Sequence, residues 1–344
     1  MKSAAAVTGS VMVPLVFATA ANREPQTGGI GGAQAGSSDQ VPKRALGKTG
    51  AEVSCLGVGG YHLGSAKDQQ EANEIVARAL DAGINFFDNA WDYHDGASEE
   101  RLGIALKGKR DRAFLMTKVC THGRDKNIGM QMLEQSLRRL QTDHLDLWQI
   151  HEVIYYNDPD LIFRPNGVAE ALTAAKQQGK VRFVGFTGHK DPAIHLRMLS
   201  QRFTFDTVQM PLNAFDATFR SFERQVLPEA QKQGLGILGM KSLGGSGEMV
   251  THGAVTAHEG LRYAMSLPVS VTISGMESVG VLEQNLEIAR GFQPMSPGEM
   301  DALRERVQYY AGDGRYELFK TTKKYDGEVG RQQHHYPTAE KLPA

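Results

Sequence analysis

The chain has few cysteines and no excess of either charge, and both absences narrow its possible functions. Only Cys55 and Cys120 occur among its 344 residues, too few for a disulfide framework or a four-thiolate metal site. Both fall in or beside predicted strands, so we expect buried free thiols. The 38 basic and 39 acidic side chains nearly cancel. Because nucleic-acid binding usually needs a basic face, we expect no nucleic-acid partner.

The sequence also lacks a confident membrane span. Its apolar stretch at residues 3–22 is short and rich in Gly, Ser and Thr, so we expect no stable membrane insertion. Ala18-Thr19-Ala20 fits a signal-peptidase cleavage site, and residues 1–22 are therefore predicted to be a signal peptide of a periplasmic or exported protein. The alternative is a disordered leader on a cytoplasmic protein. Residues 23–42, rich in Gly, Gln and Ser, are predicted to be a flexible linker.

A third absence concerns nucleotide-binding folds. No Gly-x-Gly-x-x-Gly loop follows the first predicted strand, which removes the main support for a Rossmann fold. Instead, short apolar runs alternate with segments of helical periodicity eight times in succession. Such a pattern fits a closed α/β (β/α)8 TIM barrel better than an open doubly wound sheet. The predicted strands are residues 53–58, 84–93, 113–118, 145–150, 181–186, 206–209, 235–240 and 269–274.

The predicted helices complete a barrel domain at residues 43–312. A β-hairpin is predicted before the barrel, at residues 43–53, and an extra helix after it, at residues 296–310, where Ser296 and Glu299 form a capping box. The C-terminal tail, residues 313–344, is rich in aromatic and basic residues, and its course is left open. The helices of the repeating units are predicted at residues 69–82, from 98, 129–140, 167–178, 192–200, 219–233, 255–265 and 279–290.

The stretch Ile84–Tyr93 carries the strongest functional signal, because an apolar run ends there in acids and a tyrosine. The active sites of such barrels lie at the C-terminal ends of the strands, and Lys118 and His151 end the next two strands. We therefore expect Asp88 to hold Lys118, and Lys118 to lower the pKa of Tyr93. His151 would orient a carbonyl group or relay a proton. Such a site suits proton transfer coupled to hydride transfer from a nicotinamide.

Two other chemistries use the same strand ends. A hydrolytic metal site needs several ligands of compatible geometry, but no His-x-His pair ends the first strand, so we expect no metal. A Schiff-base lysine would be Lys118 or Lys241, but Asp88 would keep Lys118 charged and poorly nucleophilic. Taken singly, each residue also has an ordinary structural explanation. The candidate metal ligands are His62, His94, His122, His151 and His189.

These motifs resemble the aldo-keto reductase family over about residues 43–310. FDNAWDYHDGASEERLG at 87–103, Thr117-Lys118 and Gln149-Ile150-His151 match its signatures. The resemblance implies a (β/α)8 barrel and a catalytic tetrad of Asp88, Tyr93, Lys118 and His151. It implies an NAD(P)-dependent oxidoreductase that reduces aldehydes or ketones, or oxidises the alcohols, with Tyr93 as general acid. The alternative within the family is a non-catalytic, nicotinamide-nucleotide-sensing regulatory subunit.

The resemblance also implies a set of cofactor-binding positions. Thr187 and Gln209 would hold the carboxamide, and Met240 would replace the aromatic residue that often stacks on the nicotinamide. The bases that usually hold a 2′-phosphate do not occur here, and Glu277 lies in that segment. We therefore keep NADP as the family default and NAD as nearly equal. The positions are Gly60, Tyr61, Asp88, Thr187, Gln209, Met240, Ser242, Gly244, Gly275, Glu277, Glu283 and Asn285.

The predicted substrate pocket lies where the first four strands end. Tyr61, Trp91, His122 and His151 follow those strands and mix aromatic with polar groups. Such a lining suits a small carbonyl compound or a sugar as the substrate.

Overall fold

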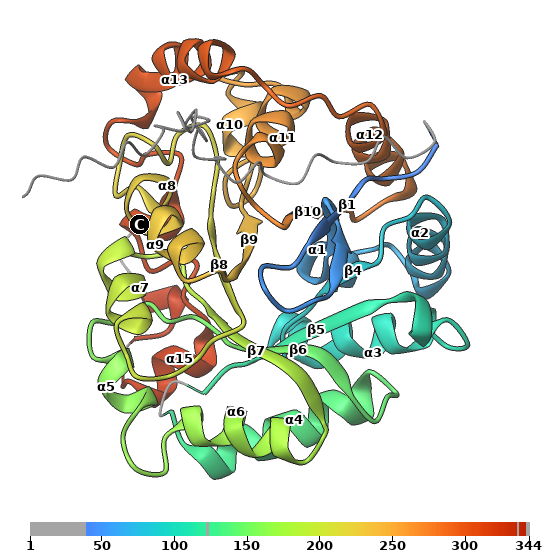
Figure 1. The fold of residues 1–344 in the computed structure, drawn as a ribbon, viewed down its shortest axis with the longest axis vertical. Helices are drawn as coiled ribbons and strands as arrows, with labels where there is room; N and C mark the ends of the chain where they lie inside the picture. The colour runs from blue at the N-terminus through green and yellow to red at the C-terminus, as the bar shows by residue number, and fades with distance from the viewer. Residues whose placement is uncertain (1–38, 122–123, 336, 342–344) are drawn as a thin grey trace, which may run out of the picture. The chain divides into compact units, whose positions relative to one another are not determined.

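The computed structural model describes residues 39–121, 124–335 and 337–341. The predicted signal peptide, and the predicted linker up to residue 38, lie outside them. Eight parallel strands close into a barrel in the order β10-β3-β4-β5-β6-β7-β8-β9, which confirms the predicted fold (Figure 1). The strands are β3 (Leu56–Gly59), β4 (Phe86–Asp88), β5 (Phe114–Val119), β6 (Leu145–Ile150), β7 (Val181–Thr187), β8 (Thr207–Pro211), β9 (Gly236–Met240) and β10 (Val271–Gly275).

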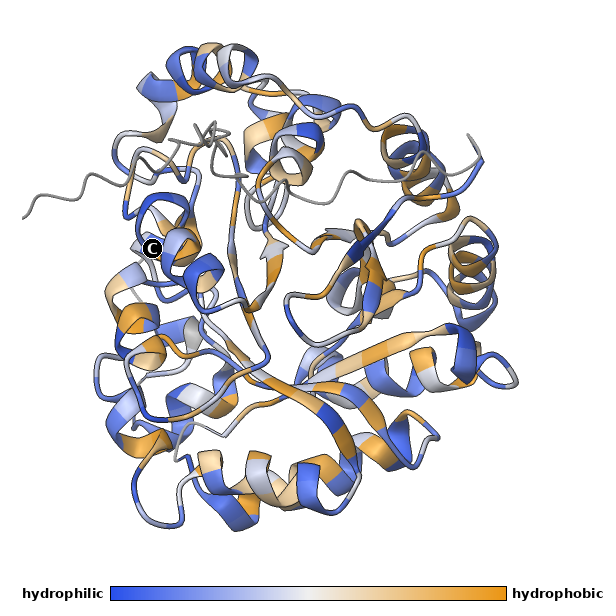
Figure 2. Cartoon of the chain, in the orientation of Figure 1, coloured by the Kyte–Doolittle hydropathy of each residue, from blue (hydrophilic) through white to orange (hydrophobic). Residues whose placement is uncertain are grey.

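Helices pack around the outside of the strands. Their apolar faces meet the outer face of the barrel in one large core, which includes Ile75, Leu133 and Trp148. Figure 2 shows the same division, with hydrophobic colour along the strands and mixed colour on the surrounding helices. These helices are α2 (Gln69–Asp81), α3 (Ala97–Ala105), α4 (Lys126–Arg139), α6 (Val168–Gln177), α7 (Pro192–Leu199), α8 (Phe222–Gln225), α9 (Leu227–Lys232), α11 (Ala257–Ser266) and α12 (Val279–Arg290).

A hairpin closes the N-terminal end of the barrel. Its strands β1 (Lys43–Ala45) and β2 (Glu52–Ser54) pair antiparallel, close to the predicted range. Leu46 and Val53 are buried with side chains that begin the barrel strands, among them Phe86 and Phe114. The Arg44 guanidinium donates to the carbonyl oxygens of Val269 and Met265 at 3.0 and 2.9 Å. The hairpin therefore plugs the end of the barrel opposite the polar strand ends.

One predicted helix is divided in the structure. Residues 219–233 were expected to form a single helix, but α8 ends at Gln225 and α9 begins at Leu227 with Pro228 in its first turn. Proline has no backbone N–H to continue the preceding helix. The remaining elements are α1 (Gly60–Gly64), η1 (Tyr93–Gly96), η2 (Arg110–Arg112), α5 (Asp158–Ile162), α10 (Glu248–Thr251), α13 (Pro297–Ala311), α14 (Leu318–Thr321), α15 (Glu328–Gln333) and η3 (Ala339–Lys341).

The C-terminal tail folds across the rim that the strand ends form. The predicted capping box of Ser296 and Glu299 begins α13, and α14 and α15 follow it. Asp326 pairs with Lys190 at 2.7 Å, and the backbone N–H of Gly327 donates to both carboxylate oxygens of Glu152 at 3.0 Å. The tail is thus attached next to the ends of β6 and β7. Among the described residues, none of the helices has the length and apolarity required to span a membrane.

Candidate active site

Three neighbouring strands bring the predicted catalytic residues to one rim. Asp88 is the last residue of β4, Lys118 is the last but one of β5, and His151 directly follows β6. The backbone N–H of His151 donates to the carbonyl oxygen of Val119 at 2.9 Å, which extends the pairing of β5 and β6 by one step. The C-terminal ends of these neighbouring parallel strands therefore place three polar side chains at the same edge.

Lys118 is the centre of this arrangement. Its ammonium is 2.5 Å from Asp88 Oδ1 and 2.8 Å from the carbonyl oxygen of Asn89. It lies 3.4 Å from the Tyr93 hydroxyl oxygen. Lys118 and Asp88 are only 1% and 4% exposed, so neither charge is balanced by bulk water. A buried charge requires a partner of opposite charge, and Lys118 and Asp88 are each other's partners.

Tyr93 is held by rings on two sides. It begins η1, in which His94 and Asp95 adopt left-handed backbone angles with φ of 51° and 56°. The phenol ring packs edge-on against Tyr61 at 5.4 Å between centroids, and against His151 at 5.6 Å. Left-handed backbone in residues other than glycine is strained and often accompanies functional sites. The strained turn aims the phenol toward the Lys118 ammonium.

The pKa of Tyr93 departs from the sequence-based expectation. Burial raises this pKa well above its ordinary value, and the carboxylates of Asp88, Asp92 and Glu152 raise it further. We expected Lys118 to lower the pKa, but its charge is already balanced by Asp88 in direct contact. The phenol is therefore protonated throughout the neutral range. A raised pKa suits a phenol that donates its proton better than a phenol that is already ionised at rest.

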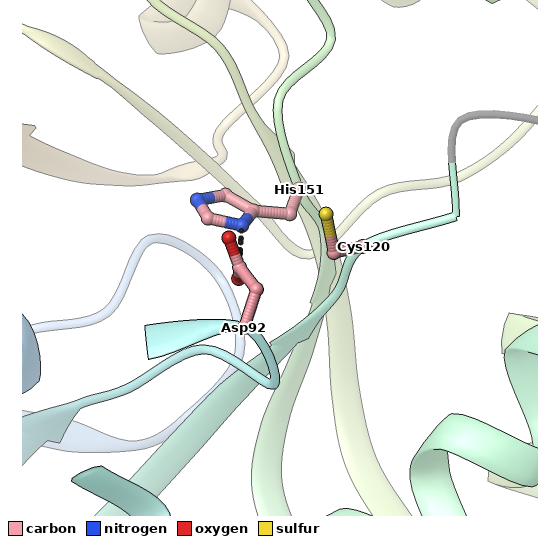
Figure 3. Close-up of side chains that lie close together, drawn as sticks. All are labelled: Asp92, Cys120 and His151. Carbon is pink, nitrogen blue, oxygen red and sulfur yellow. Dashed lines mark hydrogen bonds and ion pairs between the residues drawn. The ribbon is translucent and has the colours of Figure 1, made fainter. Parts of the chain in front are cut away.

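His151 is fixed by a carboxylate that the sequence analysis did not assign. Its Nδ1 lies 3.0 Å from Asp92 Oδ1, which leaves Nε2 for a ligand. Figure 3 draws this contact as a dashed line. Burial acts to raise the pKa of Asp92. His151, and to a smaller extent Lys118, outweigh burial and hold this pKa below its ordinary value. The carboxylate therefore stays charged and orients the imidazole. An acid four residues after a strand-end acid was the available signal for this contact.

Cys120 lies next to this pair. Within the described part of the chain, Asp92, Cys120 and His151 form a group of possible metal ligands whose donor atoms all lie within 4.8 Å of one another (Figure 3). Burial raises the pKa of the Cys120 thiol well above its ordinary value, and Asp92 adds to the effect. Both cysteines are buried and unpaired, as predicted. Of the candidate histidines in the described ranges, only His151 belongs to this group.

A buried arginine, Arg124, also holds the backbone that follows β6. The Arg124 guanidinium donates to the carbonyl oxygens of His151 and Glu152, both at 2.9 Å, and to Asp158 Oδ1 at 3.1 Å. Both side chains of that ion pair are fully buried. The network fixes the backbone that carries His151, and sequence spacing gave no sign of it.

The rim surrounds a cavity of about 650 Å³. All four predicted catalytic residues line it. So do most predicted cofactor and substrate positions, together with residues of the tail. The predicted positions on its surface are Tyr61, Asp88, Tyr93, Lys118, His151, Thr187, Gln209, Met240, Ser242, Gly244, Gly275 and Glu277.

Some predicted positions lie elsewhere. The indole Nε1 of Trp91 donates to Gln135 at 2.7 Å, and Trp91 does not line the cavity. Glu283 pairs with Arg78 on the exposed surface at 2.9 Å. Asn285 is buried and donates to Ser274 Oγ at 3.2 Å.

Gly60 and His122 complete the set of predicted positions. Gly60 is buried under β4, where a Cβ would lie 2.3 Å from the Asp88 carbonyl oxygen, so only glycine fits there. His122 lies outside the described residues.

The polar groups of Gln209 and Thr187 beside Met240 have weak partners or none. The amide Nε2 of Gln209 and the hydroxyl of Thr187 contact the Met240 sulfur at 3.5 and 3.9 Å. Gln209 Oε1 is buried without a hydrogen-bond partner in the described part of the chain. Leaving such groups unpaired is costly, so their arrangement anticipates a ligand with both donors and acceptors. A carboxamide has this donor and acceptor set, and the residues present therefore fit a nicotinamide.

Sequence reasoning missed the contribution of the tail to this cavity. Lys324, Tyr325, Asp326 and Gly327 line it, and so does Lys241. The Tyr325 hydroxyl donates to Glu248 at 2.8 Å and lies 2.9 Å from Ser246 Oγ. The aromatic residues of the tail were the only available signal, and they did not indicate where the tail folds.

Comparison with known proteins places these features in context. The model of the aldo/keto reductase family matches residues 55–251. The chain is 31% identical to the aldo-keto reductase YhdN of Bacillus subtilis over 207 residues, or 54% of this chain and 57% of that protein. It is 32% identical over 220 residues to a 6-dehydroglucose reductase of Novosphingobium aromaticivorans, covering 59% of this chain and 69% of that one.

A solved structure shows the same similarity in three dimensions. The holo form of the aldo-keto reductase AKR11C1 of Bacillus halodurans superposes with a TM-score of 0.64 and 25% identity. The superposition covers 82% of this chain and all of that one. The sequence match to YhdN, in contrast, spans little more than half of its length. The region matched by the family model contains the four predicted catalytic residues and ends before the tail.

Proposed function

The chain belongs to the aldo/keto reductase family, and from this membership we propose that it is a nicotinamide-dependent oxidoreductase. It reduces an aldehyde or ketone to the alcohol, or catalyses the reverse reaction. The observation that carries the proposal is the 3.4 Å contact between the Lys118 ammonium and the Tyr93 hydroxyl, inside a cavity that His151 also lines. A phenol beside a buried ammonium is suited to give a proton to a carbonyl oxygen.

The protein side chains handle the proton and the orientation of the substrate. Tyr93 gives its proton to the carbonyl oxygen, and the Lys118 ammonium stabilises the phenolate as it forms. Asp88 keeps Lys118 charged and in place. His151 directs Nε2 to the carbonyl oxygen because Asp92 holds its Nδ1. A bound nicotinamide would supply the hydride to the carbonyl carbon, so that carbon and oxygen together gain the two hydrogens of the alcohol.

The residues beside Met240 would hold the nicotinamide. Gln209 offers an unpaired acceptor for the carboxamide, and its amide donor and the Thr187 hydroxyl contact only the Met240 sulfur. Met240 offers a polarizable surface for the ring. Ser242 and Gly244 follow on the cavity surface, where small residues leave room for a pyrophosphate.

Glu277 on the cavity surface supports a preference for NAD(H) over NADP(H). Glu277 lines the cavity together with Gly275 and Val281, and a carboxylate repels a 2′-phosphate but accepts hydrogen bonds from a ribose diol. Fluorescence titration of the protein with NADH and NADPH tests this preference, and we expect a lower Kd for NADH. Glu277→Gln should narrow the difference. Equal dissociation constants in the wild type would contradict the proposal.

Steady-state turnover tests the main function. NADH and NADPH oxidation across a panel of aldehydes should show turnover in the wild type, and kcat in Tyr93→Phe should fall about 10²- to 10⁴-fold. Tyr309→Phe, at an exposed position of α13 outside the cavity, is the matched control and should retain most of the activity. A wild type that binds the nucleotide but reduces none of the aldehydes would instead favour a regulatory subunit. A Tyr93→Phe protein of unchanged kcat would exclude the mechanism.

A further inference from the structure

Lys241 is a second lysine in the cavity, and the proposed chemistry does not use it. It directly follows β9 and adopts a left-handed backbone conformation with φ of 55°. Strain of this kind in a residue other than glycine persists only where the surroundings enforce it, and it is frequent at functional sites. The Lys241 side chain lines the same cavity as Tyr93 and His151. Its position therefore calls for an explanation of its own.

The Lys241 ammonium is positioned by the tail. It lies 5.2 Å from the centroid of the Phe319 ring and 5.3 Å from that of Tyr325. Phe319 is fully buried, and Tyr325 is fixed by its hydrogen bond to Glu248. Cations are attracted to ring faces at such distances, so the rings hold the amine without using its N–H donors. Across the described ranges, the Lys241 ammonium has no hydrogen bond or ion pair.

The carboxylates around Lys241 are already engaged. Glu152 accepts from the backbone N–H of Gly327, and Glu248 accepts from Tyr325 and from the backbone N–H of Ser246. Burial lowers the pKa of Lys241 to about 8, Glu152 opposes this effect, and Lys118 adds to it. The amine is thus mostly charged at neutral pH. A partly buried, charged amine with free donors is stabilised by an anion that enters with the ligand.

We propose that Lys241 binds the anionic group of an acidic carbonyl substrate, such as a carboxylate on an aldehyde. The inference rests on the proposed function and adds a substrate class to it. The pyrophosphate of the cofactor has the same chemistry, because Ser242 and Gly244 follow directly in the chain. The substrate is favoured because the rings that hold the amine belong to the tail, and the tail is attached through Gly327 to Glu152, the residue after His151. Both rings lie outside the region that the family model matches.

Paired substrates test this assignment in the full-length protein. The first pair is 4-carboxybenzaldehyde with methyl 4-formylbenzoate, and the second is succinic semialdehyde with butanal. In Lys241→Met, kcat/KM for the two acids should fall about 10- to 100-fold, the effect of losing one charge-assisted hydrogen bond. The values for the ester and for butanal should change less than about 3-fold. Lys241→Arg should restore much of the preference for acids.

Two controls separate the possible sources of the anion. The Kd of NADH, measured by fluorescence titration, should be the same in Lys241→Met and in the wild type. A weaker cofactor affinity with equal losses for all four aldehydes would assign the amine to the pyrophosphate and overturn the proposal. Lys324→Met removes an exposed lysine of the same cavity and should leave the preference intact. An equal loss in that variant would show a general field effect, which also overturns the assignment of Lys241.

Failure of the proposed function remains distinguishable from failure of this inference. Reduction of the neutral aldehydes by the wild type tests the function without reference to Lys241. Calorimetric binding of 4-carboxybenzaldehyde and its methyl ester tests Lys241 even in a protein that reduces neither. Weaker binding of the acid alone in Lys241→Met upholds the inference, and unchanged binding overturns it.

Discussion

Two lysines in the described ranges are buried and pair with acids, and they have different roles. Lys118 contacts Asp88 at the rim of β4 and β5. Lys320, in α14, contacts Asp216 at 2.6 Å and Glu317 at 2.9 Å, and all three side chains are fully buried. Both ammoniums also donate to a backbone carbonyl oxygen at 2.8 Å. Composition and burial alone therefore do not distinguish an active site from a structural ion cluster.

The third group around each lysine makes the difference. At Lys118 it is the Tyr93 phenol, which faces the cavity, and the ammonium and Asp88 balance each other. At Lys320 it is a second carboxylate, so one positive charge meets two negative ones. Burial raises the pKa of Asp216 and of Glu317 because the surplus negative charge has no access to water. The first arrangement can stabilise a newly formed phenolate, whereas the second ties the tail to the barrel.

Removal of the Lys118 ammonium should lower activity strongly, whereas removal of the Lys320 ammonium should change it little. The loss of activity without Lys118 is the largest expected effect. Lys118→Met should lower kcat about 10²- to 10⁴-fold, because the phenolate would form without a neighbouring positive charge. Lys320→Met should leave kcat within about 3-fold, since it contacts neither the phenol nor the cavity. Steady-state aldehyde reduction measures both. A comparable loss of kcat in the folded Lys320→Met protein would break the distinction.

The second prediction concerns the stability of the folded protein, and here Lys320 is the lysine whose removal should have the large effect. Lys320→Met leaves two buried carboxylates without their cation, so the free energy of unfolding should fall by about 3–5 kcal/mol. Urea denaturation of the full chain, followed by fluorescence, measures the change. Lys126→Met is the matched control, because Lys126 and Glu170 form a half-exposed pair at 3.0 Å that should contribute under about 1 kcal/mol. Equal effects of the two substitutions would refute the role of the cluster.

The third prediction concerns the pH dependence of stability, which follows from the surplus negative charge of the Lys320 cluster. Burial raises the pKa of Glu317 to about 7, whereas an unfolded glutamate titrates near about 4.3. Between these values the folded chain holds a proton that the unfolded chain releases, so this contribution to stability is lost as pH rises. The slope is at most about 1.4 kcal/mol per pH unit. Glu317→Gln removes the surplus charge but keeps the acceptor for Asn213.

The measurement is a comparison of unfolding free energies between pH 5 and pH 8. Glu317→Gln should gain on the wild type as pH rises, because only the wild type loses the proton. Glu305→Gln, at an exposed position of α13, is the control and should follow the wild-type profile. Parallel profiles for Glu317→Gln and the wild type would show that the cluster carries no surplus charge in the folded protein.

The sequence predicted the barrel and the catalytic rim because both depend on local periodicity and on strand order. Asp88, Lys118 and His151 end consecutive strands, and parallel neighbours must share an edge. The Lys320 cluster was not predictable, since 104 residues separate Lys320 from Asp216 and no periodicity connects them. The break between α8 and α9 did have a signal, Pro228, whose missing N–H favours a helix start there.

Trp91, which was predicted to line the pocket, illustrates another limit of reasoning from strand ends. Trp91 follows a strand as the pocket residues do, but Gln135 accepts its indole N–H and Arg139 packs on its ring at 5.3 Å. Both partners come from α4, which is distant in sequence. The direction of the Tyr93 pKa was missed for a similar reason, because the balance of charge around the phenol includes Asp92 and Glu152 as well as Lys118. Strand ends indicate where a residue lies, not what surrounds its side chain.

The smallest expected effect comes from a third kind of ion pair, on the surface. Glu283 was predicted to contact the cofactor, but its carboxylate pairs with Arg78 at 2.9 Å, and both side chains are nearly half exposed. Water and salt screen such a pair, so Glu283→Gln should lower the free energy of unfolding by less than about 1 kcal/mol. The Kd of NADH should change less than about 2-fold. A larger rise in Kd, measured by fluorescence titration, would show that Glu283 contributes to cofactor binding despite its exposed ion pair with Arg78.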